Sequence, residues 1–343
     1  MVIASHDNFS TDYAAVRSGG AGLIDFSTRG RVVVTGSEAV MFLNGLITND
    51  MKTLALNMWM PAAFPNVQGR LLAMVRIIHQ QAPDTSEEEF LIDTEAATHD
   101  QVLKIIERFT LAGDFHVHDR SPETGHLSLQ GIAASRLVAD VFGEPVAAVE
   151  DYSVVQTNWL GHNVTLFRAT HTGADGYDLL FDSAAADQLR SVLIEAGAEP
   201  VGPETFETLR IEGGVPRYGI DMDETNVVSE TGLDDAVSFT KGCYIGQEII
   251  ARIKYRGHVA KRLAGLVFEG STIPEPGTKI SVADKDIGRV TSATLSPALK
   301  SSIALGYVKY DYLAPGTEVR VGETAAKVVE LPFVTGKSDQ NVA

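Results

Sequence analysis

The sequence predicts an α+β fold that ends in a small all-β domain. Up to about residue 260, helical and strand-like stretches follow one another in an irregular order, unlike the regular alternation of doubly wound folds. From Ala264 to about Phe333, short β-type runs alternate with turns such as Pro276-Gly277 and Pro315-Gly316. This pattern has almost no helical spacing and predicts a small β-barrel. The length of 343 residues indicates two or three domains.

The elements before the barrel follow from the hydrophobic period and from the capping residues and glycines around them. Apolar residues three and four apart predict helices at 13–17, 38–43, 98–109, 135–142, 184–196 and 203–213. Runs of β-branched or alternating residues predict strands at 30–35, 90–92, 115–118, 125–129, 163–168 and 179–181. Residues 58–79 are predicted to form a hairpin around a turn at 66–69, and 337–343 a polar tail.

Composition is that of a soluble globular protein, with 44% apolar and 21% charged residues. No apolar run approaches the roughly 20 residues that span a bilayer, so we expect no membrane association. No secretory signal is visible at the N-terminus, and a single thiol suits a reducing compartment, so we expect a cytoplasmic protein. The net charge of −17 argues against broad binding to nucleic acid.

The only cysteine, Cys243, lies in the stretch Lys241-Gly242-Cys243-Tyr244-Ile245-Gly246-Gln247-Glu248. Because one cysteine can form no internal disulfide, the thiol either packs as a small apolar group or does chemistry. Apolar spacing predicts a helix over 244–253, which would place Cys243 at a helix N-terminus beside the cation Lys241. That setting favours the reactive thiolate. Cys243 and Lys241 are therefore the candidate catalytic residues, with a buried packing role for Cys243 as the alternative.

A basic segment surrounds this cysteine. Between Lys241 and Arg262, six basic residues and one acid give a local charge of +5 in an otherwise acidic chain. Such a run commonly solvates a surface. Its coincidence with the lone cysteine favours an anion-binding rim, for a polycarboxylate, a phosphate or an acidic partner protein.

No generic catalytic or metal-binding motif is present. The chain has no Gly-x-Gly-x-x-Gly after a strand, no phosphate-binding Gly-Lys-Ser/Thr loop and no His-x-x-x-His pair on a helix. His116 and His118 share one face of a predicted strand, where solvation is favoured over a metal pair. One cysteine cannot hold an iron–sulfur cluster alone, although it could lend a ligand. We therefore expect no resident metal.

The stretch 241–248 resembles the signature of the YgfZ-type folate-binding proteins, whose mitochondrial relatives act in late iron–sulfur cluster assembly. Other motifs occur in the family order, namely Asn66-Val67-Gln68-Gly69-Arg70, Thr172-Gly173-x-Asp175-Gly176-Tyr177, the run 209–219, Gly288-Arg289-Val290-Thr291-Ser292 and Leu331-Pro332-Phe333. The ordered set covers nearly the whole chain and is specific. The same pattern is similar to the aminomethyltransferase (T-protein) of the glycine cleavage system.

The resemblance implies a T-protein-like ring of three domains round a central hole, with tetrahydrofolate, in mono- or polyglutamylated form, bound inside. It implies a folate-binding α+β domain made of 1–50 plus 130–255, and a second α+β domain over 51–129. The third domain is the C-terminal β-barrel over 260–335.

Asp178 closes the glycine-rich turn 172–178 and is implied to grip the pteridine, because a carboxylate can pair with its amino group and ring N–H. It is one carbon shorter than the usual Glu. Arg210 matches the motif arginine near the folate. A purely structural role for both is the alternative. The other expected cofactor-binding residues are Asn66 and Tyr218 from matching motifs, and Lys254 and Arg256 from the basic segment.

One departure separates two branches of this superfamily. The aminomethyltransferase branch carries acids on the strand after the glycine turn, where this chain has Ala73 and Met74. General acid–base help is worth typically 10²–10⁴-fold, so its loss argues against efficient one-carbon transfer. We therefore expect a folate-binding factor that supports assembly or repair of iron–sulfur clusters through Cys243, with assembly proteins or client enzymes as partners. The alternatives are a folate-dependent aminomethyltransferase and a non-catalytic, folate-regulated interaction module.

Overall fold

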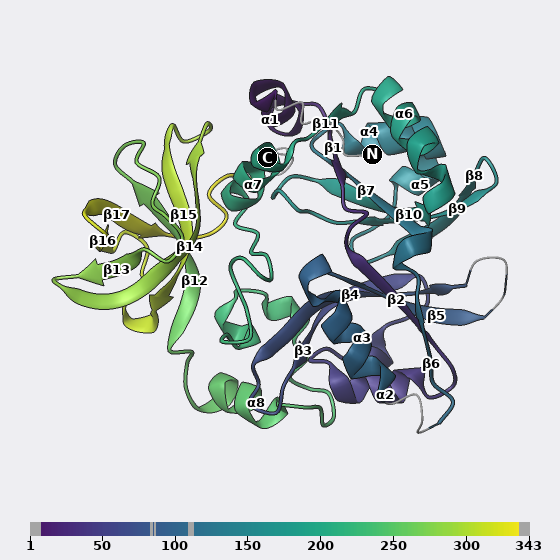
Figure 1. Ribbon diagram of the computed structural model, residues 1–343, viewed down its shortest axis with the longest axis horizontal. Coiled ribbons are helices and arrows are strands. Elements are labelled where there is room, and N and C mark those ends of the chain that lie inside the picture. The colour runs from purple at the N-terminus through teal and green to yellow at the C-terminus, as the bar shows by residue number, and fades with distance from the viewer. Residues whose placement is uncertain (1–7, 83–84, 86, 109–112, 336–343) are drawn as a thin grey trace, which may run out of the picture.

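The computed structural model describes residues 8–82, 85, 87–108 and 113–335, and these form two sheets with their helices and a separate barrel (Figure 1). The first sheet has six strands, in the order β11 (Glu199–Pro200), β1 (Gly22–Asp25), β7 (Thr124–Gln130), β10 (Gly176–Asp182), β9 (His162–Arg168) and β8 (Val154–Trp159). The second has five, in the order β3 (Met58–Pro65), β4 (Leu71–Gln81), β5 (Glu88–Thr94), β2 (Gly30–Thr35) and β6 (His116–Asp119).

The barrel is closed and its strands run in the order β12 (Lys261–Phe268), β15 (Ser301–Lys309), β14 (Lys285–Ser296), β13 (Lys279–Val282), β16 (Glu318–Val321) and β17 (Thr324–Val329). The helices are α1 (Phe9–Arg17), α2 (Ala39–Leu46), α3 (His99–Glu107), α4 (Ala134–Phe142), α5 (Glu144–Ala147), α6 (Ala186–Glu195), α7 (Pro203–Glu212) and α8 (Gln247–Arg256). Short 3₁₀ turns lie at Met51–Thr53, Ala96–Thr98, Ser121–Glu123, Ser183–Ala185, Val228–Glu230, Asp234–Ala236 and Tyr310–Tyr312. None of these helices combines the length and apolar character that a bilayer crossing needs, within the described part of the chain.

The two sheets pack against each other and carry their helices on the outside. Apolar residues of α4, α5 and α6 form one core with the first sheet, and those of α2 and α3 form another with the second. A third cluster joins the inner faces of the sheets, where Val33 and Ile78 meet Phe167 and Leu180. This arrangement leaves the polar residues of the inner faces to line the space between the sheets.

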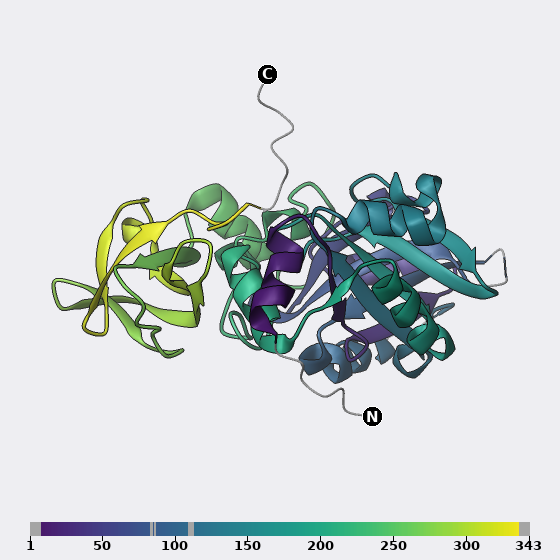
Figure 2. The same ribbon diagram turned by 90° about the horizontal axis from the view of Figure 1, so that it is seen from above.

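Helix α7 connects this body to the barrel, which lies at one end of the molecule in both views (Figures 1 and 2). Two of its charged residues are fully buried at the junction. Arg210 donates hydrogen bonds to Asp221 (2.7 Å) and to the Ser292 hydroxyl on β14 (2.9 Å). Glu212 accepts from the Ser296 hydroxyl (2.5 Å), and its backbone carbonyl accepts from the Phe333 N–H (2.9 Å). The barrel is thus held by buried polar contacts as well as by apolar packing.

The α+β class and the C-terminal barrel are confirmed, and two segments differ from the expected layout. Strand β2 and helix α2, expected in the first unit with 1–50, belong to the second sheet, because β2 pairs with β5 and β6. Strand β7, expected largely within 51–129, pairs with β1 and β10 of the first sheet. Local pattern defines a strand but not its partners, so sheet membership was not readable from the sequence.

The helix after the cysteine begins later than predicted. It starts at Gln247, and Gly246 before it has the left-handed conformation, with φ of 77°. A Cβ at Gly246 would lie 2.4 Å from the carbonyl oxygen of Asn66, so the close approach to the β3–β4 turn requires glycine there. Cys243 therefore lies in the preceding loop and not at the helix N-terminus.

Candidate functional site

A cavity of about 650 Å³ opens between the inner faces of the two sheets and the segment that follows α7. Its walls include the aromatic rings of Phe26, Trp59, Phe206 and Tyr218. Charged side chains from β4, β9 and the loops lie among them, and no barrel residue contributes. Such a volume, with apolar walls and a few polar groups, is that of a typical small-molecule site.

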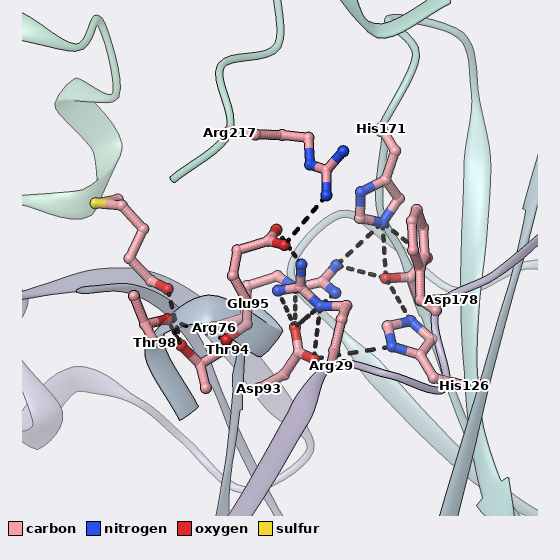
Figure 3. A network of polar contacts seen from close by, with 12 residues as sticks. Arg29, Arg76, Asp93, Thr94, Glu95, Thr98, His126, His171, Asp178 and Arg217 are labelled. Carbon is pink, nitrogen blue, oxygen red and sulfur yellow. Dashed lines mark hydrogen bonds and ion pairs between the residues drawn. The ribbon is translucent and has the colours of Figure 1, made fainter. Parts of the chain in front are cut away.

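A network of buried charges lies at the wall of this cavity (Figure 3). Arg76 on β4 bridges two fully buried carboxylates: its Nη1 donates to Asp178 (2.5 Å), and its Nη2 donates to Asp93 (2.8 Å). Asp178 also lies 2.9 Å from Nε2 of His171 and 3.1 Å from Nε2 of His126. Arg76 and His171 line the cavity, whereas Asp178 lies behind them. Arg76 and His171 thus lie between the carboxylate and the cavity.

The charges of this network hold both carboxylates ionised. Burial by itself would raise the pKa of Asp178, but His171, Arg76 and His126 outweigh it and hold that pKa well below its usual range. Arg29 and Arg76 do the same for Asp93, whose pKa is also lowered against the effect of burial. Burial lowers the pKa of His126, which favours its neutral form.

A second chain of ion pairs continues along the same wall. Glu95 pairs with Arg29 and lies 3.7 Å from Arg217, and Arg217 also pairs with Glu207 at 2.5 Å. Despite burial, Arg29 and Arg217 hold the pKa of Glu95 below its usual range. The Glu95 and Arg217 side chains are 20% and 32% exposed, so this part of the wall is open to a ligand.

The expected cofactor-binding residues fall into two groups. Tyr218 lines the cavity and donates a hydrogen bond to the carbonyl of Leu71 (3.2 Å), and Arg210 also contributes to the lining. Arg210 is fully buried and bonded to Asp221 and Ser292, so its charge serves the junction with the barrel. Asn66 does not line the cavity. Its side-chain oxygen accepts from the N–H groups of residues 68 and 70 and stabilises the turn.

Strand β4 carries Ala73 and Met74, the two positions at which the resemblance to the transferase branch implies acids. The strand alternates, so that Ala73 is fully buried in the core of the second sheet while Met74 lines the cavity. Arg76, two residues further, faces the same side as Met74. A thioether and a guanidinium therefore occupy the cavity face of this strand.

Lys241 does not activate Cys243 in the way expected. Its ammonium group is buried and donates hydrogen bonds to the backbone carbonyls of Asn44 (2.8 Å), Ile47 (2.9 Å) and Asn49 (2.5 Å). Burial lowers the pKa of Lys241 to about 8. The cation is thus committed to fixing the C-terminal end of α2, where carbonyls lack helical partners. Cys243 is exposed and lies outside the cavity lining, which differs from the expected buried alternative as well.

The basic segment lies along α8. Lys254 is exposed, and its ammonium lies 5.0 Å from the centroid of the Phe239 ring. Arg262 pairs with Asp234 at 2.7 Å. Arg256 is the last residue of α8, and its side chain lies outside the described part of the structure. Lys254 does not line the cavity, so any contact with a ligand inside would involve a long, extended tail.

Sequence reasoning missed Arg76 and His171, although both left a signal. His171 opens the polar turn that ends at Asp178, seven residues later. Arg76 shares a face with Met74 because alternate residues of a strand point the same way. Neither signal shows that the two side chains meet at Asp178, since β4 and β10 belong to different sheets. Within the described residues, no group of three or more His, Cys, Asp or Glu side chains is arranged to hold a metal ion.

Comparisons with known proteins place nearly the whole chain in one family. Residues 4–241 match the GCVT N-terminal domain, and residues 261–335 match the glycine cleavage T-protein C-terminal barrel domain. The aminomethyltransferase of Halalkalibacterium halodurans is 33% identical over 94% of this chain and 88% of its own length. That of Rubrobacter xylanophilus is 33% identical over 95% of this chain and 86% of its own length.

The fold agrees with these matches. A crystal structure of the glycine cleavage system aminomethyltransferase T from Bartonella henselae superposes with a TM-score of 0.86, at 23% identity, over 96% of this chain and 90% of that one. With both domain matches in order and relatives named aminomethyltransferase at 33% identity along nearly all of its length, the chain belongs to the GCVT (glycine cleavage T-protein) family.

Proposed function

We propose that this protein binds a reduced folate in its central cavity and supports the assembly or repair of iron–sulfur clusters, with Cys243 as the reactive group. The observation that carries the proposal is on β4, where Met74 lines the cavity and Ala73 is buried. The resemblance to the transferase branch implies acids at these two positions. A thioether neither donates nor accepts a proton, so the folate would be held without general acid–base help from this strand. Folate then serves as a bound regulator or scaffold more readily than as a one-carbon acceptor.

The cavity fits a folate in size and in chemistry. About 650 Å³ accommodates a drug-sized ligand, and the rings of Trp59, Phe206 and Tyr218 offer surfaces for a flat pterin. Asp178 would pair with the donor edge of the pterin, and Arg217 lies on the open part of the wall. We expect reduced folate to bind in the low micromolar range, of order −8 kcal/mol.

Calorimetry with Asp178→Ala tests this part. Loss of charge-assisted hydrogen bonds should weaken folate binding by roughly 1–3 kcal/mol. The exposed Asp187, on α6 and away from the cavity, provides a matched control, since Asp187→Ala should leave affinity unchanged. An unchanged affinity in Asp178→Ala would move the folate site elsewhere.

The iron–sulfur part rests on Cys243. An exposed thiol in a loop can reach a partner, whereas a packed thiol cannot, and soft thiolate is a preferred ligand of iron–sulfur clusters. Cys243→Ser keeps the size of the side chain but removes the soft ligand. Cells that rely on this variant should lose activity of iron–sulfur enzymes while the purified variant stays folded and binds folate. Full activity of those enzymes in the variant cells would remove Cys243 from the mechanism.

A second candidate is folate-dependent aminomethyl transfer, because relatives named aminomethyltransferase are 33% identical along nearly the whole chain. The two candidates separate when the protein is incubated with tetrahydrofolate and the methylamine-loaded lipoyl carrier. We expect no methylene-tetrahydrofolate above background from the native chain, and a measurable gain from Met74→Asp, which returns a carboxylate to the cavity wall. Robust product from the native chain would favour the transferase.

The basic segment would contact folate only when the ligand carries a polyglutamate tail. If Lys254 and Arg256 hold a polyglutamate tail, folates with longer tails should bind more tightly at low salt, and salt should reduce the advantage. Charge reversal of both residues to Glu should abolish it while monoglutamate binding is kept. Equal affinity for all tail lengths at low salt would leave the segment free for a protein partner.

A further inference from the structure

The carboxylate proposed to grip the pterin is already occupied. Both oxygens of Asp178 accept from side chains of this chain: Arg76 contacts Oδ2, and His171 Nε2 lies 3.0 Å from Oδ1 and 2.9 Å from Oδ2. His126 Nε2 lies 3.1 Å from Oδ2 on the buried side. A pterin that presents its paired donors to Asp178 must therefore displace at least one of these contacts.

Arg76 is the competitor among these whose charge does not depend on pH. Its guanidinium is permanently charged, whereas burial favours the neutral form of His126. Two further contacts hold Arg76 in place: Nε and Nη2 donate to Asp93 at 3.0 and 2.8 Å, and the guanidinium carbon lies 5.2 Å from the centroid of the Phe167 ring. Only Nη1 is engaged with Asp178. A ligand can thus take over that one bond while Arg76 stays attached to Asp93.

We propose that Arg76 is the affinity-determining residue of the cavity, because its guanidinium competes with the donor edge of a ligand for the Asp178 carboxylate. The inference rests on the proposed folate site, and it adds that Arg76 lowers the affinity of this site for folate. Since Asp93 also pairs with Arg29, removal of Arg76 leaves Asp93 compensated. Asp178, by contrast, would lose its only permanently charged partner among the described residues.

Calorimetry with Arg76→Met tests the inference. The variant should bind 5-formyltetrahydrofolate about tenfold more tightly than the native chain, because the hydrogen-bond donors of the ligand then meet a carboxylate that has lost its guanidinium partner. The 2-desamino-2-methyl analogue of this folate lacks one donor of the edge, and its affinity should change much less. In an Asp178→Asn background, Arg76→Met should bring no gain in folate affinity, since the carboxylate for which Arg76 and the ligand compete is absent.

Arg76→Lys covers the case in which Arg76→Met does not fold, as judged by circular dichroism. A lysine ammonium is a point charge that cannot bridge both carboxylates in the manner of a guanidinium, so its gain should lie between native and Arg76→Met. Unchanged or weaker folate binding in the folded variant, or an equal gain for the analogue, would overturn the inference while leaving the folate site intact. Absence of folate binding in the native chain and in every variant would overturn the folate site itself, and the inference with it.

Discussion

Asp178 and Asp93 are ionised residues in a place that water does not reach, and this has a consequence for acid stability. Their lowered pKa values mean that the unfolded chain binds protons more readily than the folded chain as pH falls below about 4. The stability they contribute is fully present above their unfolded pKa and is lost as pH falls through that value toward the folded pKa. We therefore expect the free energy of unfolding, measured by urea titration, to fall steeply between pH 5 and about pH 2.

Asp178→Asn isolates one of these carboxylates. At pH 7 it should lower the free energy of unfolding by roughly 3 kcal/mol, because a buried charge loses a partner. Below pH 4 its stability should depend on pH less steeply than that of the native chain. The exposed Asp187→Asn should leave the pH dependence nearly as in the native chain. A native-like acid profile in Asp178→Asn would contradict the assignment of an ionised Asp178.

Cys243 gives a simpler prediction. Because the thiol is exposed, iodoacetamide should modify one group per chain in the folded protein without denaturant. Mass spectrometry measures the added mass, and Cys243→Ser should take up none. Labelling that appears only after addition of urea would mean that the thiol is covered in solution.

At the scale of elements, the turn after β3 and the loop before α8 depend on each other. Gly246→Ala would place a Cβ 2.4 Å from the carbonyl oxygen of Asn66 and force a non-glycine residue to φ of 77°. The conformational cost alone is roughly 1–2 kcal/mol, and the backbone must also shift. We expect a loss of at least about 2 kcal/mol in the free energy of unfolding.

Gly242→Ala is the matched control, since nothing lies within 4 Å of a Cβ there and its φ is outside the left-handed region. It should leave stability nearly unchanged. Equal losses from the two alanines would mean that the contact between the turn and the loop is not tight in solution.

The same elements show how far the sequence could be read. Glycines at turns and the alternation of apolar and polar residues along strands located the β3–β4 hairpin and the barrel, because both signals are local. The start of α8 was placed three residues early, since Tyr244 and Ile245 continue the apolar spacing although Gly246 interrupts the helix. Lys241 was expected to act on its neighbour Cys243, but its partners, at Asn44 to Asn49, are distant in sequence. Arg76 and Asp178 come together only because two sheets pack face to face, which no local pattern encodes.

On the scale of the whole molecule, buried charged residues hold the barrel against α7 and the segment that follows it. Asp221 accepts from Arg210 and from the hydroxyls of Thr291 and Ser292, and all four residues are buried. Asp221→Ala would leave the guanidinium of Arg210 buried without that carboxylate. We expect a loss of roughly 3–5 kcal/mol in the free energy of unfolding, together with faster proteolysis in the connection near Gly257.

Lys279→Ala provides the control, because it removes one partner of an ion pair on the barrel whose lysine side chain is 80% exposed. Pairs of that kind contribute little to stability. Proteolysis of Asp221→Ala at the native rate, with native stability, would show that apolar contacts alone hold the barrel in place.

The junction between α7 and the barrel also has a consequence for biosynthesis. Leu331 and Phe333 return from the barrel to pack beside Ile211, and the Phe333 N–H donates to the Glu212 carbonyl, more than one hundred residues back along the chain. A ribosome therefore releases α7 long before it has made the segment that completes its surroundings. Until the barrel docks, Arg210 lacks its contact with Ser292 and Glu212 lacks its contact with Ser296, so each new molecule passes through a stage in which both sheets can be finished while the barrel is undocked. A nascent chain that stalls before Leu331 has every barrel strand but lacks the segment that packs beside Ile211 and bonds to Glu212, so we expect its barrel to dock less firmly.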